Sequence, residues 1–572
     1  MMITVNITPA NIPDAIHNLE DTWSNVSFAL RIQAFGWKNL ETYSPVLDFI
    51  TRKLAVKEIE VIAYEDINFS LACLIASKTA EAAGSNPSVV KLSLSVRIWS
   101  QEHLPKVAAL LVTLPSITSL DLCTPEEVDH DALPCSDMEE RKIACAISSM
   151  SQLETLKLHV LPPFESLILN QISGQRNCFI RLKELFCWQH EVDGRVPAAA
   201  EAVASFLGSP NASMLESLHL DLEHFNEEDS TAIFGALMGI SSISWLEMSF
   251  FGNAAPHSQN LATYLQSNSS KLLQSLTMDI ADDTVLMALQ NKLSLTHLKL
   301  VHLRGNAALS LKTLLRKNQS IASLQVEMAY PQNAELDLLV NALADGLVTN
   351  TSIKSLFIQV WVQHVERAID FSLFSRVVAD SSCPCALETF RIKLDGRFTD
   401  QTTSSLADLV GNPDCCLENV AVDGLWSDDE RTQALLVKGI QSNLKLQDFR
   451  FVRGNSSTAI QQGIRAVLLR NSAAKAGKSG SLPGTGLLHL LNYVGKTRKR
   501  CQISSSQESS CSAQVLYTWL QNHPQAVKKS KEGADCGTQS LSAKHGMFKA
   551  GSGPKEHSTE HGEPESKRAR LG

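Results

Sequence analysis

Apolar residues recur along the chain in short segments of the form L-x-x-L-x-L. The clearest copies are LETLKL at residues 153–158, LESLHL at 215–220 and LTHLKL at 295–300. Degenerate copies, in which other apolar residues replace leucine, extend from about residue 30 to residue 451. Successive copies lie about 22 to 36 residues apart, and about fifteen copies can be recognised. This regularity indicates one repeat protein rather than several independent domains.

The spacing of the apolar positions predicts a strand and a helix in each repeat. Alternation within each L-x-x-L-x-L segment is typical of a strand with every second side chain turned inward. Between these segments, apolar residues lie three and four positions apart, as in an amphipathic helix. We expect such helices at residues 307–317, 334–347, 403–410 and 431–440.

Polar residues mark the ends of these helices. Acids and hydroxyls at 226–230 and 427–430 are typical of helix starts. Asn318, Asn350 and Asn443 follow helices and precede the next strand. Asparagine tolerates the left-handed conformation that often ends a helix, so we expect that conformation at these three positions.

Stacking of these units predicts the fold class. A single strand–helix unit has one apolar face that it cannot bury alone, whereas stacked units bury a continuous core. We therefore expect an α/β leucine-rich repeat solenoid. Because a helix is wider than a strand, the stack should curve into a horseshoe. The parallel sheet would then form the concave face and the helices the convex face.

The best-formed repeats resemble a known family. The sequences NQSIASLQV at 318–326 and NTSIKSLFI at 350–358, each preceded by a full helix, resemble the ribonuclease-inhibitor-like subclass of leucine-rich repeat proteins. The resemblance covers about residues 26–472. It implies a protein that binds other proteins through its concave face.

The two ends of the chain differ from the repeats. Residues 1–25 are expected to form an N-terminal cap, with a strand at 3–7 and a helix at 12–19, ahead of the solenoid at 26–472. Residues 473–486 are typical of a linker, and 487–527 of a short helical C-terminal segment. From residue 528 to 572 the chain is polar and rich in glycine, which predicts a disordered tail.

Charged segments suggest two further features, each with a simpler alternative. Lys567, Arg568 and Arg570 in the tail are a candidate nuclear import signal; the alternative is a solvated tail. An acid-rich stretch at 126–140 lies in a long insertion and could add an acidic rim; the alternative is a solvated loop.

Composition and net charge limit the classes of binding partner and the cellular compartment that we expect. Hydrophobic residues make up 44% of the chain, enough for an extended core, and the net charge is -9. Because phosphate binding needs a basic face, this charge makes nucleic acid an unlikely partner. No apolar run is long enough to span a membrane, and the first residues do not resemble a signal peptide. These features predict a cytoplasmic protein, with the nucleus as the alternative location.

The thirteen cysteines show no metal-ligand spacing. Two close pairs, Cys383 with Cys385 and Cys415 with Cys416, are too near in sequence for good disulfides. We therefore expect reduced thiols that act mostly as small core residues.

The sequence contains none of the common catalytic motifs. It has no phosphate loop, no H-E-x-x-H and no G-x-S-x-G. The G-K-S at 477–479 lacks both the first glycine and a preceding strand, so it is read as linker. We expect neither an enzyme nor a cofactor.

A binding surface can be predicted from the positions that flank the inward residues. These positions should lie on the concave face, where exposed aromatic rings beside polar groups resemble interface hot spots. The candidates are Phe186, Trp188, His219, Asp221, Trp245, Glu247, Phe357 and Trp361. The alternative is a register shifted by one residue, which would place these rings in the core.

These observations favour a protein-binding scaffold with an unknown protein partner. One alternative is a regulator of a partner enzyme, such as a GTPase activator like the Ran GTPase-activating proteins, which share this repeat class. Another is a substrate receptor of a ubiquitin ligase. That role would need an F-box-like helical module upstream, for which residues 1–25 are too short.

Overall fold

One parallel sheet runs through the whole described chain. The computed structural model describes residues 2–451, with gaps of which the longest are 11–26, 125–136, 189–196 and 362–368, and also residues 468 and 471. Within these residues a 16-stranded sheet has its strands in sequence order. The strands are β1 Met2–Ile7, β2 Ser27–Gln33, β3 Val56–Ala63, β4 Lys91–Arg97, β5 Ser119–Cys123, β6 Thr155–His159, β7 Glu184–Cys187, β8 Ser217–Asp221, β9 Trp245–Ser249, β10 Ser275–Asp279, β11 His297–Val301, β12 Ser323–Ala329, β13 Ser355–Trp361, β14 Thr389–Arg397, β15 Asn419–Leu425 and β16 Asp448–Phe451.

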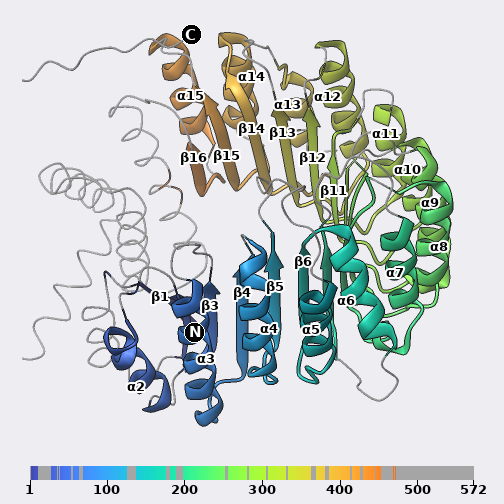
Figure 1. Ribbon diagram of the computed structural model, residues 1–572. Helices are drawn as coiled ribbons and strands as arrows, with labels where there is room; N and C mark the ends of the chain where they lie inside the picture. Colours follow the sequence, from blue (N-terminus) through green and yellow to red (C-terminus); the bar gives the residue numbers. More distant parts are fainter. Residues whose placement is uncertain are drawn as a thin grey trace, which may run out of the picture.

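Helices cover the outer side of the sheet (Figure 1). They are α2 Ser44–Arg52, α3 Phe69–Ser85, α4 Leu104–Val112, α5 Asp137–Ser148, α6 Pro162–Gly174, α7 Pro197–Leu207, α8 Glu227–Leu237, α9 Ala255–Gln266, α10 Asp283–Leu289, α11 Ala308–Lys317, α12 Asn333–Leu347, α13 Ser372–Ala379, α14 Asp400–Gly411 and α15 Glu430–Ser442. The strands line the inside of an arc and the helices its outside. This arrangement is the expected leucine-rich repeat solenoid, with a concave sheet and a convex helical layer.

The repeated apolar positions build the core because each strand pairs in register with the next. Leu298 lies opposite Leu276 of β10 and Leu324 of β12, and all three side chains are buried. Lys299, the next residue, points to the other face and is partly exposed. The predicted strand register is therefore confirmed at the centre of the sheet.

Asparagines join neighbouring repeats at the C-terminal ends of the helices. The Asn350 side chain donates from Nδ2 to the carbonyl oxygens of Leu315, at 2.6 Å, and Asn318, at 2.9 Å. Its Oδ1 accepts from the backbone N–H groups of Ser352 and Ile353, both at 2.9 Å. Asn318 makes the same contacts one repeat earlier. These buried amides therefore satisfy backbone groups on both sides of each turn.

The expected left-handed conformation of these asparagines is wrong. Asn318 has φ −83° and ψ 118°, an extended conformation. Among the described residues other than glycine, a positive φ occurs only at His302. At Asn318 and Asn350 the reason is that the side-chain amide caps the previous repeat, so the backbone does not need to reverse.

Lys292 takes the asparagine position in the repeat before Asn318. Its Nζ donates to the carbonyl oxygen of Leu265 at 3.0 Å and also contacts Ser270 Oγ. Burial lowers the pKa of this amine, because a charged group loses hydration there. The same backbone requirement is thus met by a different donor.

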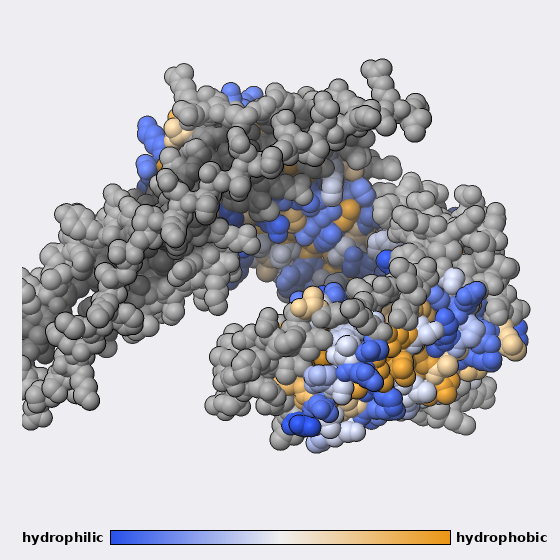
Figure 2. All heavy atoms as spheres, turned by 60° about the vertical axis from the view of Figure 1, so that its left-hand side comes forward, coloured by the Kyte–Doolittle hydropathy of each residue, from blue (hydrophilic) through white to orange (hydrophobic). Residues whose placement is uncertain are grey.

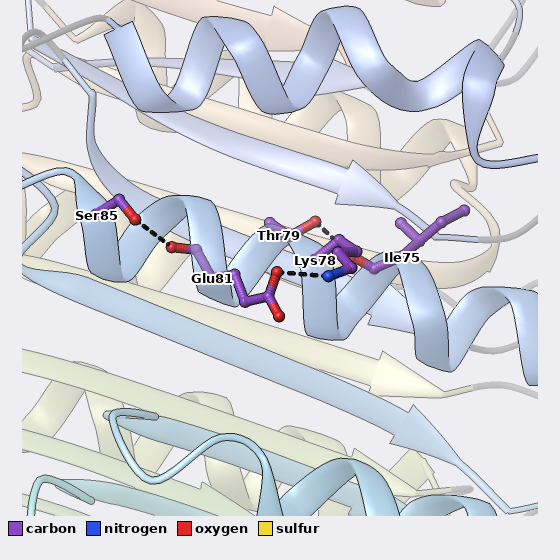
Figure 3. Close-up of polar contacts among 5 residues, drawn as sticks. All are labelled: Ile75, Lys78, Thr79, Glu81 and Ser85. Carbon is purple, nitrogen blue, oxygen red and sulfur yellow. Dashed lines mark hydrogen bonds and ion pairs between the residues drawn. The ribbon is translucent and has the colours of Figure 1, made fainter.

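The convex helices keep one face polar. In α3, Lys78 forms an ion pair with Glu81 at 2.7 Å, and Ser85 Oγ donates to the Glu81 carbonyl oxygen (Figure 3). Thr79 is buried instead; its hydroxyl donates to the Ile75 carbonyl oxygen and contacts the hydroxyl of Tyr43 at 2.6 Å. The helix therefore turns its charged residues outward and packs the others on the sheet.

The predicted elements agree closely with the structure. The helices expected at 307–317, 334–347, 403–410 and 431–440 are α11, α12, α14 and α15, and α14 and α15 extend beyond both expected ends. The strand expected at 3–7 is β1, which pairs in parallel with β2 as part of the same sheet. Asn226 caps α8 as expected, in a reciprocal pair with Asp229.

Several predictions concern residues outside the described part of the chain. These are the helix at 12–19, most of the acid-rich stretch at 126–140, the segments 473–486, 487–527 and 528–572, and the import candidates Lys567, Arg568 and Arg570. Among the helices that the structure describes, none has the length and apolar character needed to cross a membrane.

Replacing Leu298 by Asp should strongly destabilise the protein. Leu298 is only 2% exposed, so the variant buries a carboxylate without a partner, at a cost of several kcal/mol, about 3 or more. Thermal unfolding followed by circular dichroism measures this. His297→Asp is the control, since His297 is exposed on the same strand, and it should change stability by less than about 0.5 kcal/mol. Equal melting curves for both variants would contradict the register.

Replacing Asn350 by Ala should cost about 2 to 4 kcal/mol, because two carbonyls and two backbone N–H groups lose their partner in a buried turn. Urea unfolding of the full chain measures the loss. Asn170→Ala is the matched control, since Asn170 lies exposed on α6 and alanine favours helix. A loss for Asn350→Ala no larger than for Asn170→Ala would mean that the buried amide does not join the repeats.

Candidate functional site

The parallel register places residues from four adjacent strands in one row on the concave face. Lys157 of β6 lies opposite Phe186 of β7, Phe186 opposite His219 of β8, and His219 opposite Glu247 of β9. Trp188 follows β7 and extends its pairing, because its backbone N–H donates to the Leu158 carbonyl oxygen at 2.9 Å. We call Lys157, Phe186, Trp188, His219 and Glu247 the His219 cluster.

The rings of the His219 cluster are stacked. The imidazole of His219 lies with its centroid 5.8 Å from that of Phe186 and 5.1 Å from that of Trp188, at interplanar angles of 25° and 21°. The Lys157 Nζ lies 4.8 Å from the centre of the Phe186 ring. Ring stacking and a cation over a ring face both stabilise fixed orientations. The cluster is thus an ordered patch rather than a set of independent side chains.

Glu247 completes the His219 cluster electrostatically. Its Oε2 lies 3.3 Å from His219 Nδ1. The hydrogen bond from His219 lowers the pKa of the Glu247 carboxyl, while partial burial opposes this shift and the charge of Lys299 supports it. The carboxylate therefore holds the imidazole through Nδ1, which fixes the ring against its aromatic neighbours.

The two tryptophans keep part of their surface open. Trp245 on β9 is 44% exposed, the largest exposure among the predicted aromatic residues. Its strand neighbours are Ser217 and Ser275, whose short side chains leave the indole clear. Phe186 and Trp188 are half-buried, whereas Leu185 and Cys187, on either side of Phe186, are buried. The rings thus lie on the concave side, and the shifted register is excluded.

His219 and Asp221 are a correction to the predicted surface. Both are only 5% exposed, so neither is an open concave side chain. His219 is covered because the rings beside it stack on its own ring. Asp221 turns back to the chain, where its Oδ1 accepts from the Glu223 backbone N–H at 3.1 Å and shapes the turn after β8.

A second aromatic cluster lies further along the concave face, on β13 and β14. The Arg391 guanidinium lies 4.7 Å from the centre of the Phe357 ring, and Lys393 Nζ lies 4.8 Å from that of Trp361. Phe357 and Arg391 are direct partners in the sheet. We call these four residues the Phe357 cluster. The structure thus pairs both rings of this cluster with a cation.

Sequence reasoning missed the cations of both clusters. Lys157, Arg391 and Lys393 each flank an inward position of their strand, as the predicted rings do. The shared strand position could therefore have predicted these contacts, because residues at the same strand position in adjacent repeats become neighbours. The His219 and Phe357 clusters share a pattern of half-exposed rings held by charged side chains.

Figure 2 turns the open side of the arc forward and shows hydrophilic and hydrophobic residues intermingled on the recessed wall. In the part of the chain that the structure describes, no three His, Cys, Asp or Glu side chains are grouped so as to hold a metal ion. The described residues of the two clusters present ring faces, cations and a carboxylate on the concave side of the sheet.

Comparisons with known proteins add little support to the fold assignment. No protein-family model matches the sequence, and no curated protein does. The crystal structure of a TLR13–ssRNA13 complex is similar with a TM-score of 0.35 and 11% sequence identity, over 78% of this chain and 57% of that chain. This chain therefore spans little more than half the length of that protein. The fold assignment rests on the sheet order and the repeated register.

Replacing Glu247 by Gln should lower stability at neutral pH by about 1 kcal/mol, because the charged hydrogen bond to His219 is lost. The folded-state pKa of Glu247 lies below its ordinary value of 4.5. Its stabilising contribution is therefore complete above that value and is lost as the pH falls through the folded-state pKa.

Urea unfolding between about pH 7 and pH 3 tests this by comparing wild type with the variant. The difference should shrink toward the acid end. Glu60→Gln is the control, because its ion pair with Arg31 at 3.1 Å is exposed and should contribute less than about 0.5 kcal/mol. A Glu247→Gln difference that stays constant across this range would show that the carboxylate charge is not involved.

Proposed function

We propose that this protein is a scaffold that binds another protein through the concave face of its solenoid. The observation that carries the proposal is the set of partly exposed rings on the concave face: Phe186 and Trp188 at the end of β7, and Trp245 on β9, two strands away. Large rings that are already ordered lose little conformational entropy on binding, which is why they are common at the centres of interfaces. Polar residues around them would form the rim.

The separation of the two clusters favours a macromolecule over a small ligand. Phe186 lies on β7 and Phe357 on β13, six strands away in the sheet. Adjacent strands are about 4.8 Å apart, so the two clusters are separated by roughly 29 Å along the sheet. A partner that contacts both must be a folded domain or a long segment. The span fits the footprint of a protein interface.

Charge favours a protein over a nucleic acid as this partner. The net charge of -9 would oppose the approach of a polyanion. On the concave face, cations alternate with carboxylates: Lys299 pairs with Glu327 at 3.3 Å, beside Glu247 of the His219 cluster. A mixed surface of this kind suits a partner that carries both signs of charge.

The repeat subclass supports the same function. Full helices separate the strands, and the N-x-S-I-x-S-L motif at Asn318 and Asn350 forms the buried turn in both repeats. We infer that the chain lies within the ribonuclease-inhibitor-like subclass. This rests on the regular helices and these turns, and it is consistent with concave protein binding.

Truncating a central ring should weaken binding without weakening the fold. Trp188→Ala and Trp245→Ala should each reduce affinity about thirtyfold, near 2 kcal/mol, because partly exposed rings at an interface centre contribute most of the binding free energy. Affinity enrichment with the full chain identifies the partner, and calorimetry measures the affinity of each variant.

Leu309→Ala is the matched control, since Leu309 is a 70% exposed apolar residue on convex helix α11. It should leave affinity unchanged. Partner loss with Leu309→Ala but not with the tryptophan variants would move the site to the convex face. Recovery of nucleic acid, rather than protein, that depends on Trp245 would refute the proposed partner class.

A further inference from the structure

Cysteines from two neighbouring repeats meet at the amino ends of strands β14 and β15. Cys385 precedes β14, while Cys415 and Cys416 precede β15. These two segments are joined by backbone hydrogen bonds, among them Glu418 N–H to the Glu388 carbonyl oxygen at 2.8 Å. The stacking of repeats therefore brings together residues that are about thirty positions apart in the sequence.

Cys385 and Cys416 are in direct side-chain contact. The Cys385 side chain hydrogen-bonds the sulfur of Cys416, and the Cys416 thiol also lies 3.0 Å from the Leu387 carbonyl oxygen, to which it can donate. Both cysteines are partly exposed, and both are present as thiols. The contact is between repeats, and not within the close pairs that the sequence shows.

The adjacent cysteines Cys415 and Cys416 have opposite character. Cys415 is fully buried, and burial raises the pKa of its thiol to about 11. At Cys416 the hydrogen bond from Cys385 is the largest effect and lowers the pKa to about 7; partial burial opposes this. Its own backbone N–H and Lys445 favour the thiolate, and Glu388 disfavours it. Since the thiolate is the reactive form, Cys416 is the better nucleophile of the two at neutral pH.

We propose that Cys385 and Cys416 form a redox-sensitive dithiol that a peroxide converts into a disulfide between two adjacent repeats. The Cys416 thiolate attacks one peroxide oxygen, the O–O bond breaks, and Cys416 becomes a sulfenic acid as hydroxide leaves. The Cys385 sulfur then attacks the Cys416 sulfur, and the S–S bond forms as water leaves. Overall, two thiols lose two electrons and two protons, and hydrogen peroxide becomes two waters.

The disulfide would link the segments that lead into β14, which carries part of the Phe357 cluster, and into its neighbour β15. Cys385 leads directly into β14, which holds Arg391 and Lys393, and Cys416 leads into β15. A covalent link there removes the freedom of these two repeats to separate. The inference stands apart from the proposed partner binding, because thiol chemistry can be measured without any partner.

The test uses the reduced full-length chain with equimolar hydrogen peroxide. Peptide mapping by mass spectrometry should find one linkage, Cys385 to Cys416, with a loss of about 2 Da that a dithiol reductant reverses. Alkylation of Cys416 by iodoacetamide should reach half its maximal rate near pH 7, while Cys415 stays protected until the protein unfolds.

Variants separate the roles of the two sulfurs. Cys385→Ser should leave the Cys416 sulfenic acid without its resolving thiol, so that dimedone traps it. Cys416→Ser should abolish the linkage, and Cys415→Ser should retain it. A different disulfide, direct overoxidation of Cys416 in the wild type, or an alkylation rate that keeps rising well above pH 7 would each overturn the proposal. The wild-type mapping decides the matter even if a variant fails to fold.

Discussion

The structure depends on parallel pairing of each strand with its sequence neighbours in a constant register. In such a sheet, a given position of one repeat always lies beside the same position of the next. The row Leu276, Leu298 and Leu324 shows the effect in the core, and the row Phe186, His219 and Glu247 shows it on the concave face. A shift by one residue would exchange the buried and the concave positions of every strand, so burial of the leucines fixes the face on which the rings lie.

The turns between helix and strand impose a second requirement. Backbone carbonyls at the ends of helices such as α10 and α11 are buried against the next repeat and need donors. Asn318 and Asn350 meet this need with one side chain that serves two repeats. Lys292 meets it with an amine whose pKa burial lowers. This repeat position therefore requires a side-chain donor long enough to contact those carbonyl oxygens, and it does not require one residue type.

Strand positions whose side chains do not point into the core can be occupied by aromatic, charged or thiol side chains. On the concave face this freedom gives two groups of rings held by cations and a histidine, and it supports the proposed protein binding. At the amino ends of β14 and β15 the same stacking brings Cys385 to Cys416. In each case the neighbours come from different repeats, so the chemistry exists only when the repeats are stacked.

The sequence by itself determined the fold, the positions of most strands and helices, and the face on which Phe186 and Trp245 lie. It could do so because the period-two and helical spacings report directly on which side of an element is buried. Only the tertiary structure decided how residues from adjacent repeats meet. In the folded protein His219 is buried beneath two rings, and the Asp221 side chain accepts a hydrogen bond from the turn that follows its own strand. Cations lie over aromatic faces, and two cysteines about thirty residues apart in the sequence are in contact. Those outcomes depend on side-chain packing between repeats, which periodicity along one chain does not encode.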